Sequence, residues 1–374
     1  MRLHVERDDM NKAPSSPLQG LKIYDEARSA HLERALSGGM THRLLYRKAS
    51  YDFDAELART SGSTITSLIG VSRAVFASDV QCVELNEPLF LRAIPLIIAA
   101  FFGGWLRSLC KGNRPKFVTY AIENIDMAAK LSSHTRVPSP IIRVMCRTLL
   151  RWIFSCFDRV AFGTQSSKRA YEDLFGLLPS NVEVQLFPAI EPLCDHCELA
   201  KSQGQVLFLG AFDDRKGVDT VMMAWPIVQS KMPGARLILV GKGRLSQEVV
   251  EWSNAFTGVE VQIDPPRRQI HDALSASVVL VLPSRGSVRW REQVGLPIVE
   301  GLSHGCKVVT TRDTGLAEWL REHNHIILAS ADDEAELAEA ILAAISAYSD
   351  ALSVTRSLPA RSGRLDAEAW LWRA

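Results

Sequence analysis

The 374-residue sequence lacks a charge imbalance and a cysteine framework. Lys and Arg number 43 against 42 Asp and Glu, so the net charge is +1 and a dedicated nucleic-acid binder is not expected. The seven cysteines are scattered without the spacing of a disulfide set. Cys194 and Cys197 have C-x-x-C spacing, but no second pair follows. This favours linker thiols over zinc, so we expect no metal and no cofactor.

We expect neither a leader segment nor a transmembrane helix. The first residues, MRLHVERDD, are too charged for a signal peptide. Residues 93–106, AIPLIIAAFFGGWL, form an apolar run of fourteen, which is too short to span a bilayer. We expect a buried helix there, in preference to a segment at a membrane interface. The sequence therefore predicts a cytoplasmic protein.

Familiar catalytic signatures are absent as well. The sequence has no G-x-S-x-G, no P-loop and no H-E-x-x-H. Residues 240–247, VGKGRLSQ, contain G-x-G but lack the third glycine of a dinucleotide fingerprint. No acidic residue follows at the usual distance, so a dehydrogenase has little support.

Apolar strands alternate with amphipathic helices along most of the chain, which is typical of βαβ units with a parallel sheet. The length favours two domains. We expect an α/β domain at 1–190, a linker at 191–204, a second domain at 205–350, and a tail at 351–374 that packs back toward the first domain. Expected strands lie at 2–6, 42–48, 80–86, 116–124, 159–164, 182–187, 205–210, 235–241, 259–264, 278–284, 306–311 and 325–329. Expected helices lie near 22–37, 89–109, 141–157, 166–175, 218–232, 245–256, 270–277, 297–304, 315–323 and 334–349.

Two stretches of the second domain suggest anion binding. In EQVGLPIVE (292–300), Pro297 is suited to open a helix that ends before Gly305, which would place Glu300 in the first turn. The amides at that helix start form an anion site with a carboxylate on either side. In LGAFDDRKGVDT (209–220), Arg215 and Lys216 precede another helix start. Solvated loop cations explain this second stretch equally well.

The order of these motifs resembles the donor half of family 4 retaining glycosyltransferases, over about residues 205–345. The resemblance implies a GT-B fold, in which two Rossmann-like, doubly wound parallel-sheet domains face a central cleft. It also implies a nucleotide diphosphate sugar as donor and a saccharide or lipid-linked saccharide as acceptor, without a metal. The matching residues are Gly210, Lys216, Gly217, Gly241, Gly243, Pro283, Ser284, Glu292, Gly295, Pro297, Glu300, Gly305, Val308 and Val309.

The resemblance also implies roles for individual residues. Glu300 would accept hydrogen bonds from the ribose hydroxyls, and Glu292 would lie beside the donor sugar. Lys216 would neutralise the diphosphate as the glycosidic bond breaks. The implied donor-binding set is Gly210, Arg215, Lys216, Gly241, Gly243, Gly295, Leu296 and Glu300, and the implied catalytic set is Glu292, Lys216 and Glu123.

Several features depart from the family pattern. Ala211 stands where an arginine is common, the spacer RGSVRWR (285–291) before Glu292 is long and basic, and the glycine-rich loop after the first strand is reduced to PSSPLQG (14–20). The histidine at the cleft edge is missing, and Glu123 and Asn124 end the corresponding strand. Glu123 is an acid/base or acceptor-orienting candidate, weighted evenly against a structural role. A nucleotide-sugar 2-epimerase and a catalytically silent GT-B subunit stay as alternatives.

The segment at 139–157, SPIIRVMCRTLLRWIFSCF, combines an apolar helix with a basic stripe at Arg143, Arg147 and Arg151. We favour a core-packed helix with a solvated basic edge. The alternative is contact with an anionic membrane surface, which would place the protein peripherally on the cytoplasmic face.

Overall fold

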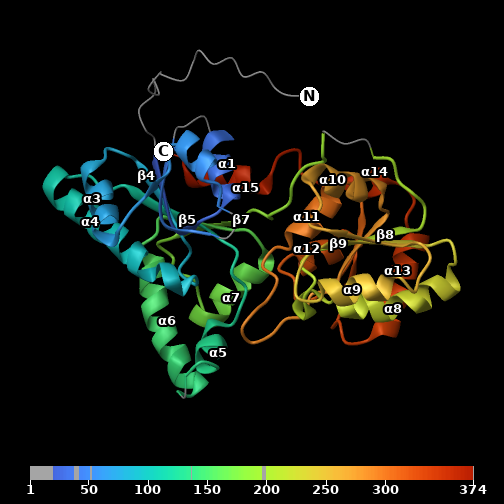
Figure 1. The fold of residues 1–374 in the computed structure, drawn as a ribbon. Coiled ribbons are helices and arrows are strands. Elements are labelled where there is room, and N and C mark those ends of the chain that lie inside the picture. The colour runs from blue at the N-terminus through green and yellow to red at the C-terminus, as the bar shows by residue number, and fades with distance from the viewer. Residues whose placement is uncertain (1–19, 38–41, 51–52, 136, 196–198, 374) are drawn as a thin grey trace, which may run out of the picture.

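The computed structural model describes residues 20–37, 42–50, 53–135, 137–195 and 199–373. Two α/β domains lie side by side, joined by the segment before residue 205 (Figure 1). Each contains one parallel sheet covered by helices, as the sequence predicts. The chain therefore has the two-domain arrangement of the GT-B fold.

The N-terminal sheet has seven strands in the order β3-β2-β1-β4-β5-β6-β7. Its central strands are buried from both faces, which explains their nearly continuous apolar character. The strands are β1 (Gly20–Ala27), β2 (His42–Ala49), β3 (Thr64–Ile65), β4 (Cys82–Leu85), β5 (Lys116–Ala121), β6 (Arg159–Phe162) and β7 (Glu183–Leu186). The helices are α1 (Ser29–Ser37), α2 (Ala55–Thr60), α3 (Leu68–Ala77), α4 (Ile94–Lys111), α5 (Met127–Ser132), α6 (Ser139–Ser155) and α7 (Gln165–Phe175).

The start of this domain differs from the sequence prediction. The helix expected near 22–37 is instead strand β1 followed by α1, and the strand expected at 2–6 lies outside the described residues. This segment is a strand and not a helix because β1 is hydrogen-bonded to β2 on one side and to β4 on the other. Residues 14–19 of the segment PSSPLQG lie outside the described residues, and Gly20 is the first residue of β1. The turn that follows β1, at Arg28, contains no glycine.

Helix α4 extends beyond the apolar run at residues 93–106, where the sequence predicts a helix. Together with a 3₁₀ turn (Leu91–Ala93), it is the one described helix long and apolar enough, by length and composition alone, to cross a membrane. Its buried face, which includes Leu96, Ile97 and Ala100, is part of the N-terminal core. Gly103 lies so close to α3 that a Cβ would come within 2.4 Å of the Ser72 carbonyl oxygen. The helix is therefore packed in the domain along one face only.

The C-terminal sheet has six strands in the order β10-β9-β8-β11-β12-β13. Every strand and helix predicted between residues 205 and 349 is present, with shifts of a few residues at the ends. The strands are β8 (Gln205–Leu209), β9 (Arg236–Gly241), β10 (Val259–Ile263), β11 (Val279–Leu282), β12 (Lys307–Thr311) and β13 (Ile326–Leu328). The helices are α8 (Val218–Lys231), α9 (Ser246–Ser253), α10 (Arg267–Ala276), α11 (Leu296–Ser303), α12 (Ala317–Glu322) and α13 (Glu334–Ser346).

The last segment of the chain touches both domains. Helix α14 (Ala351–Thr355) lies beside α11, and α15 (Gly363–Leu371) lies on the N-terminal sheet (Figure 1). Arg364 of α15 forms a buried ion pair with Glu84, which also accepts from Trp372 Nε1 at 3.2 Å. Burial by itself raises the pKa of Glu84, but the Arg364 and Lys22 charges lower it overall. Removing either partner would leave a buried charge, so this contact fixes the tail on the sheet.

Candidate functional site

The loops at the carboxyl ends of β8 and β9 approach each other through glycines. A Cβ on Gly241 would lie 1.8 Å from the Gly210 carbonyl oxygen, and one on Gly243 would lie 2.4 Å from that of Phe212. No larger residue fits at these contacts without a shift of the backbone. The three predicted glycines thus lie together at the sheet edge where ligands bind in folds of this type.

The start of α8 is held by a second close approach. Residues Asp214–Lys216 form a 3₁₀ turn capped by the Asp213 side chain, and Gly217 follows with φ of +71°. A Cβ on Gly217 would come within 2.2 Å of the Pro283 carbonyl oxygen. This packing places Lys216 beside the loop that follows β11.

Lys216 and Glu292, seventy-six positions apart in the sequence, form an ion pair. Their side chains are only 13% and 11% exposed, and Ser284 Oγ donates to the same Glu292 oxygen at 3.2 Å. The ring of Trp290 lies beneath both cations, with its centroid 5.0 Å from the Arg215 guanidinium carbon and 5.2 Å from Lys216 Nζ. The structure therefore brings three of the predicted residues into one polar cluster. Trp290 was not predicted as a site residue, because its position in a loop gives no periodic signal.

The basic spacer before Glu292 is fixed by acidic partners. Arg285 Nη1 contacts both carboxylate oxygens of Asp219, at 2.9 and 2.7 Å. Arg291 pairs with Asp313 at 3.0 Å, and Asp313 also accepts from the Gly286 amide at 2.8 Å. These contacts hold the loop to the start of α8 and to the turn after β12.

Helix α11 begins at Leu296, after Gly295 with φ of +76°. Glu300 therefore lies in the second turn, and the expected place in the first turn is wrong because the helix begins one residue before Pro297. Its carboxylate pairs with Arg267 of α10 at 2.8 Å and is 26% exposed. The Glu300 carboxylate thus has a different cationic partner from Glu292, and the two glutamates flank the helix start separately.

The N-terminal domain contributes Glu123 from the loop after β5. Gln293 Nε2 donates to Glu123 Oε2 at 3.1 Å, and Asn124 Nδ2 donates to the Glu292 carbonyl oxygen at 2.9 Å. Two predicted catalytic residues, Glu123 and Glu292, therefore lie at one contact between the domains. Glu123 faces the residue next to Glu292 and does not touch the Glu292 carboxylate in any described hydrogen bond.

A second carboxylate, missed by the sequence analysis, supports this loop. Glu87 accepts from the Ile122 and Glu123 amides at 2.9 Å each, and from the Tyr171 hydroxyl at 2.9 Å. Burial, followed by the charge of Glu123, raises the pKa of Glu87 to about 8. Its donors come from the backbone and from a core tyrosine, so Glu87 orients the loop that carries Glu123.

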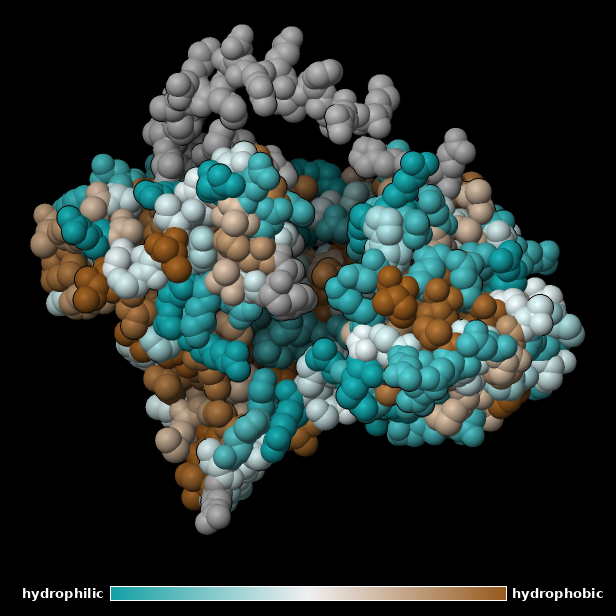
Figure 2. Space-filling view, in the orientation of Figure 1, coloured by the Kyte–Doolittle hydropathy of each residue, from teal (hydrophilic) through white to brown (hydrophobic). Residues whose placement is uncertain are grey.

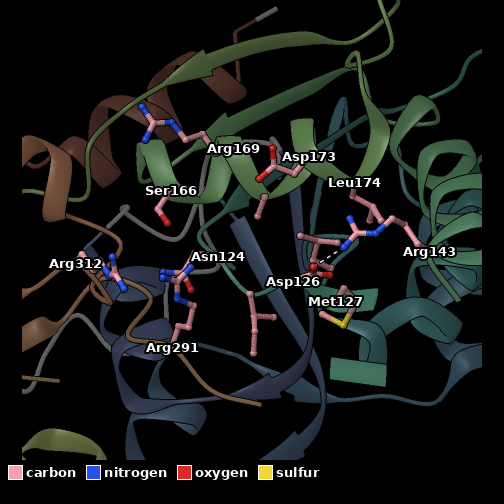
Figure 3. A pocket seen from close by; sticks show the side chains of 13 residues that line it. Asn124, Asp126, Met127, Arg143, Ser166, Arg169, Asp173, Leu174, Arg291 and Arg312 are labelled. Atoms are coloured by element: carbon pink, nitrogen blue, oxygen red, sulfur yellow. Dashed lines mark hydrogen bonds and ion pairs between the residues drawn. The ribbon is translucent and has the colours of Figure 1, made fainter. Parts of the chain in front are cut away.

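Two cavities lie beside this contact. The larger, of about 710 Å³, is lined by Glu87, Glu123 and Gln293 and by several basic side chains: Arg28, Arg34, Arg92 and Lys130 of the N-terminal domain, and Arg364 of α15. The smaller, of about 300 Å³, is drawn in Figure 3, where Arg291 and Arg312 of the C-terminal domain face Ser166 and Arg169 of α7. The cleft between the domains is therefore rich in cations.

Residues 203–347 match the family described as glycosyl transferases group 1. The C-terminal domain belongs to this family. A phosphatidyl-myo-inositol mannosyltransferase of Mycobacterium leprae (strain TN) is 24% identical over 238 residues, which are 62% of this chain and 61% of the relative. The chain thus aligns with about three fifths of that relative's length.

Solved structures with both domains resemble the whole chain. HepE of Anabaena in complex with UDP has a TM-score of 0.68 at 14% identity, covering 94% of this chain and 99% of that chain. The lipopolysaccharide outer core galactosyltransferase WaaB has a TM-score of 0.64 at 10% identity, and WaaG, a glycosyltransferase of lipopolysaccharide biosynthesis, has 0.59 at 13%. Each covers 94% of this chain and 99% of that chain. At these identities the similarity shows the GT-B fold of both domains.

Proposed function

We propose that the protein is a retaining glycosyltransferase that moves a sugar from a nucleotide diphosphate to a saccharide or lipid-linked saccharide. The observation that carries the proposal is the Lys216–Glu292 pair, held between the start of α8 and the loop before α11. The family match of the same domain supports it. A nucleotide diphosphate sugar has the charge and the hydroxyls that such a pair would bind.

Each half of the pair has a chemical task. Negative charge develops on the leaving diphosphate as the glycosidic bond breaks, and an ammonium group already in place stabilises it without a metal. Arg215, on the same ring of Trp290, adds a second cation. Once Lys216 contacts the diphosphate, the Glu292 carboxylate can accept hydrogen bonds from hydroxyls of the donor sugar.

The nucleoside would lie along α11. Glu300 has two carboxylate oxygens, and Arg267 contacts one of them, Oε1. The Glu300 carboxylate can therefore accept from ribose hydroxyls while keeping its ion pair. The amides of Gly295 and Leu296 at the helix start would face the diphosphate.

The acceptor would enter from the N-terminal domain. Glu123 borders the larger cavity and faces the donor domain through Gln293, which supports a role in orienting or deprotonating an acceptor hydroxyl. The basic residues of that cavity suit an acceptor that carries an anionic group.

A thermal-shift screen against UDP, GDP, ADP and CDP tests donor binding. A ligand at 100 times its dissociation constant stabilises the folded state by about 2.7 kcal/mol, so one nucleotide should raise the melting temperature clearly above the others. The selected nucleotide is then tested as its hexose conjugates for release of nucleoside diphosphate. Binding without release would indicate a silent subunit, and no shift with any nucleotide would contradict the proposal.

We also propose that the N-terminal domain rests on an anionic membrane, where a lipid-linked acceptor would be available. Helix α6 buries Ile142, Cys146 and Leu150, and leaves a row of apolar residues exposed on the other side. Figure 2 shows these hydrophobic residues gathered along α6 and toward the end of the domain formed by α3 and α4. The large hydrophobic residues that are exposed on α4 and α6 are Ile98, Phe102, Trp105, Leu109, Ile141, Val144, Met145, Leu149 and Trp152.

The two helices border one groove of about 620 Å³, with Trp105 on one side and Trp152 on the other. Arg143 is partnered by Asp126, and Arg151 donates to the Phe175 carbonyl at 3.3 Å. The basic stripe of the sequence is therefore partly engaged within the protein. The apolar face, with Arg147 beside it, supports membrane contact more strongly than the stripe alone.

Liposome co-sedimentation tests this surface. The unmodified protein should bind vesicles with anionic phospholipid in a salt-sensitive way and should bind neutral vesicles less, because each arginine near the surface contributes about 1 kcal/mol. Replacing Trp105 and Trp152 together by serine should abolish binding, whereas Met223→Ser, at a half-exposed position on α8, should not change it. Equal binding by both variants, or none by the unmodified protein at low salt, would contradict the proposal.

A further inference from the structure

Three side chains with metal-ligating atoms lie together near the C-terminal end of α11, and none of them belongs to the cluster around Lys216. They are Cys194 from the segment between the domains, His271 from α10, and His304 at the end of α11. One ligand atom of each lies within 4.8 Å of the other two. The Cys194 amide donates to the Ser303 carbonyl oxygen at 2.9 Å, which holds the cysteine beside the end of the helix.

His304 is oriented by its second nitrogen. Its Nδ1 lies 2.7 Å from the Glu300 carbonyl oxygen, so Nδ1 carries the proton and Nε2 is left as the acceptor. Nε2 lies 3.0 Å from Nδ1 of His271. Histidines that bind metals usually donate the opposite N–H to a carbonyl or carboxylate in this way.

The spacing of these atoms fits a tetrahedral metal. With bonds of about 2.0 Å to nitrogen and about 2.3 Å to sulfur, two ligand nitrogens lie about 3.3 Å apart, and nitrogen and sulfur slightly further. The two histidine nitrogens are 3.0 Å apart, and the three ligand atoms all lie within 4.8 Å of one another. Small side-chain movements would bring these atoms to the tetrahedral spacing. Thiolate together with imidazole is a ligand set that favours zinc.

We propose that Cys194, His271 and His304 bind a zinc ion. The C-x-x-C spacing alone favoured thiols without metal, but the two histidines come from elements 77 and 110 positions further along the chain, which spacing could not indicate. The ion would join the segment between the domains to the end of the helix that carries Glu300. With three protein ligands, the fourth position of a tetrahedral zinc ion would hold a water molecule. The ion would have no part in the proposed glycosyl transfer.

The test is metal content and cobalt substitution on the full chain under reducing conditions. Protein purified without chelator, or stripped and then given zinc alone, should hold one zinc per chain. Cobalt(II) should give the absorption of a thiolate complex. Cys194→Ser should lose that absorption and most of the zinc, and His271→Asn should weaken binding at least tenfold, whereas Cys110→Ser, at an exposed cysteine, should change neither.

The cobalt spectrum of the unmodified protein does not depend on any variant folding. Removal of zinc by a chelator should also lower the melting temperature, since a ligand of the folded state alone stabilises it. A substoichiometric zinc content together with no thiolate band would overturn the proposal. Zinc retained equally by Cys194→Ser and Cys110→Ser would overturn it as well, and the histidine pair would then be a hydrogen bond only.

Discussion

The replacement Lys216→Met keeps most of the side-chain stem and removes the charge that the proposed chemistry needs. The ammonium group lies in an ion pair with side chains only 13% and 11% exposed, where electrostatic interactions are stronger than in water. Loss of one preorganised electrostatic group typically costs 10²- to 10³-fold in kcat, or about 2.7–4 kcal/mol. We therefore expect turnover to fall at least about 10²-fold with the preferred donor.

Glu292 is nearly buried, and the same change removes its cationic partner. Among the described residues, the Ser284 hydroxyl would be its remaining side-chain donor. Removing one partner of a buried pair destabilises a protein by about 3–5 kcal/mol, so part of any loss could come from the fold. The double variant Lys216→Met with Glu292→Gln has no unpaired charge at this place. Its melting temperature should recover relative to the single variant, while its turnover should stay low.

The assay is steady-state release of nucleoside diphosphate, with kcat and KM fitted separately for each variant and the melting temperature measured in parallel. Arg215→Met is the matched control, because Arg215 lies on the same Trp290 ring but is 49% exposed, and its loss should cost less. A single variant with kcat within a few-fold of the unmodified protein would refute the role of Lys216. Recovery of both stability and turnover in the double variant would show that the loss was structural.

Three further predictions concern the site and its supports. Glu300→Ala should lower nucleotide affinity measured by calorimetry with little change in melting temperature, and unchanged affinity would remove the ribose contact. Gly217→Ala should destabilise the fold by more than about 1–2 kcal/mol in urea unfolding, because positive φ is combined with a contact of 2.2 Å to the Pro283 oxygen. Glu87, with its folded-state pKa raised to about 8, keeps a proton that the unfolded chain releases above about pH 4.3. Its contribution to stability is therefore full below that pH and falls by about 1.4 kcal/mol per unit up to about pH 8. Glu87→Gln should flatten this slope in pH-dependent unfolding, and an unchanged slope would contradict the assignment.

The C-terminal domain was predictable because its local patterns agree with its tertiary structure. Strands such as β8 and β11 are buried on both faces and read as continuous apolar runs. Gly217 and Gly305, at φ of +71° and +73°, lie at a helix start and a helix end where their conformation is needed. The order of such residues was enough to indicate the fold.

The remaining features depend on contacts that leave no local pattern. The sequence pattern of β1 predicts a helix, although pairing on both sides makes this segment a central strand. The contact of Glu123 with Gln293 joins residues 170 positions apart. Glu87 and Trp290 likewise acquire their partners only when distant segments meet. Periodicity and spacing carry no information about such pairs.

Anomeric configuration followed by proton NMR tests the central claim most directly. The unmodified protein is incubated with the α-linked hexose conjugate of the nucleotide selected by thermal shift, together with a saccharide acceptor. We expect nucleoside diphosphate and a new α-linked product, at a rate at least about 10²-fold above that of the Lys216→Met, Glu292→Gln double variant. A β-linked product would contradict retention of configuration. A rate equal to that of the double variant would contradict the assignment of the site.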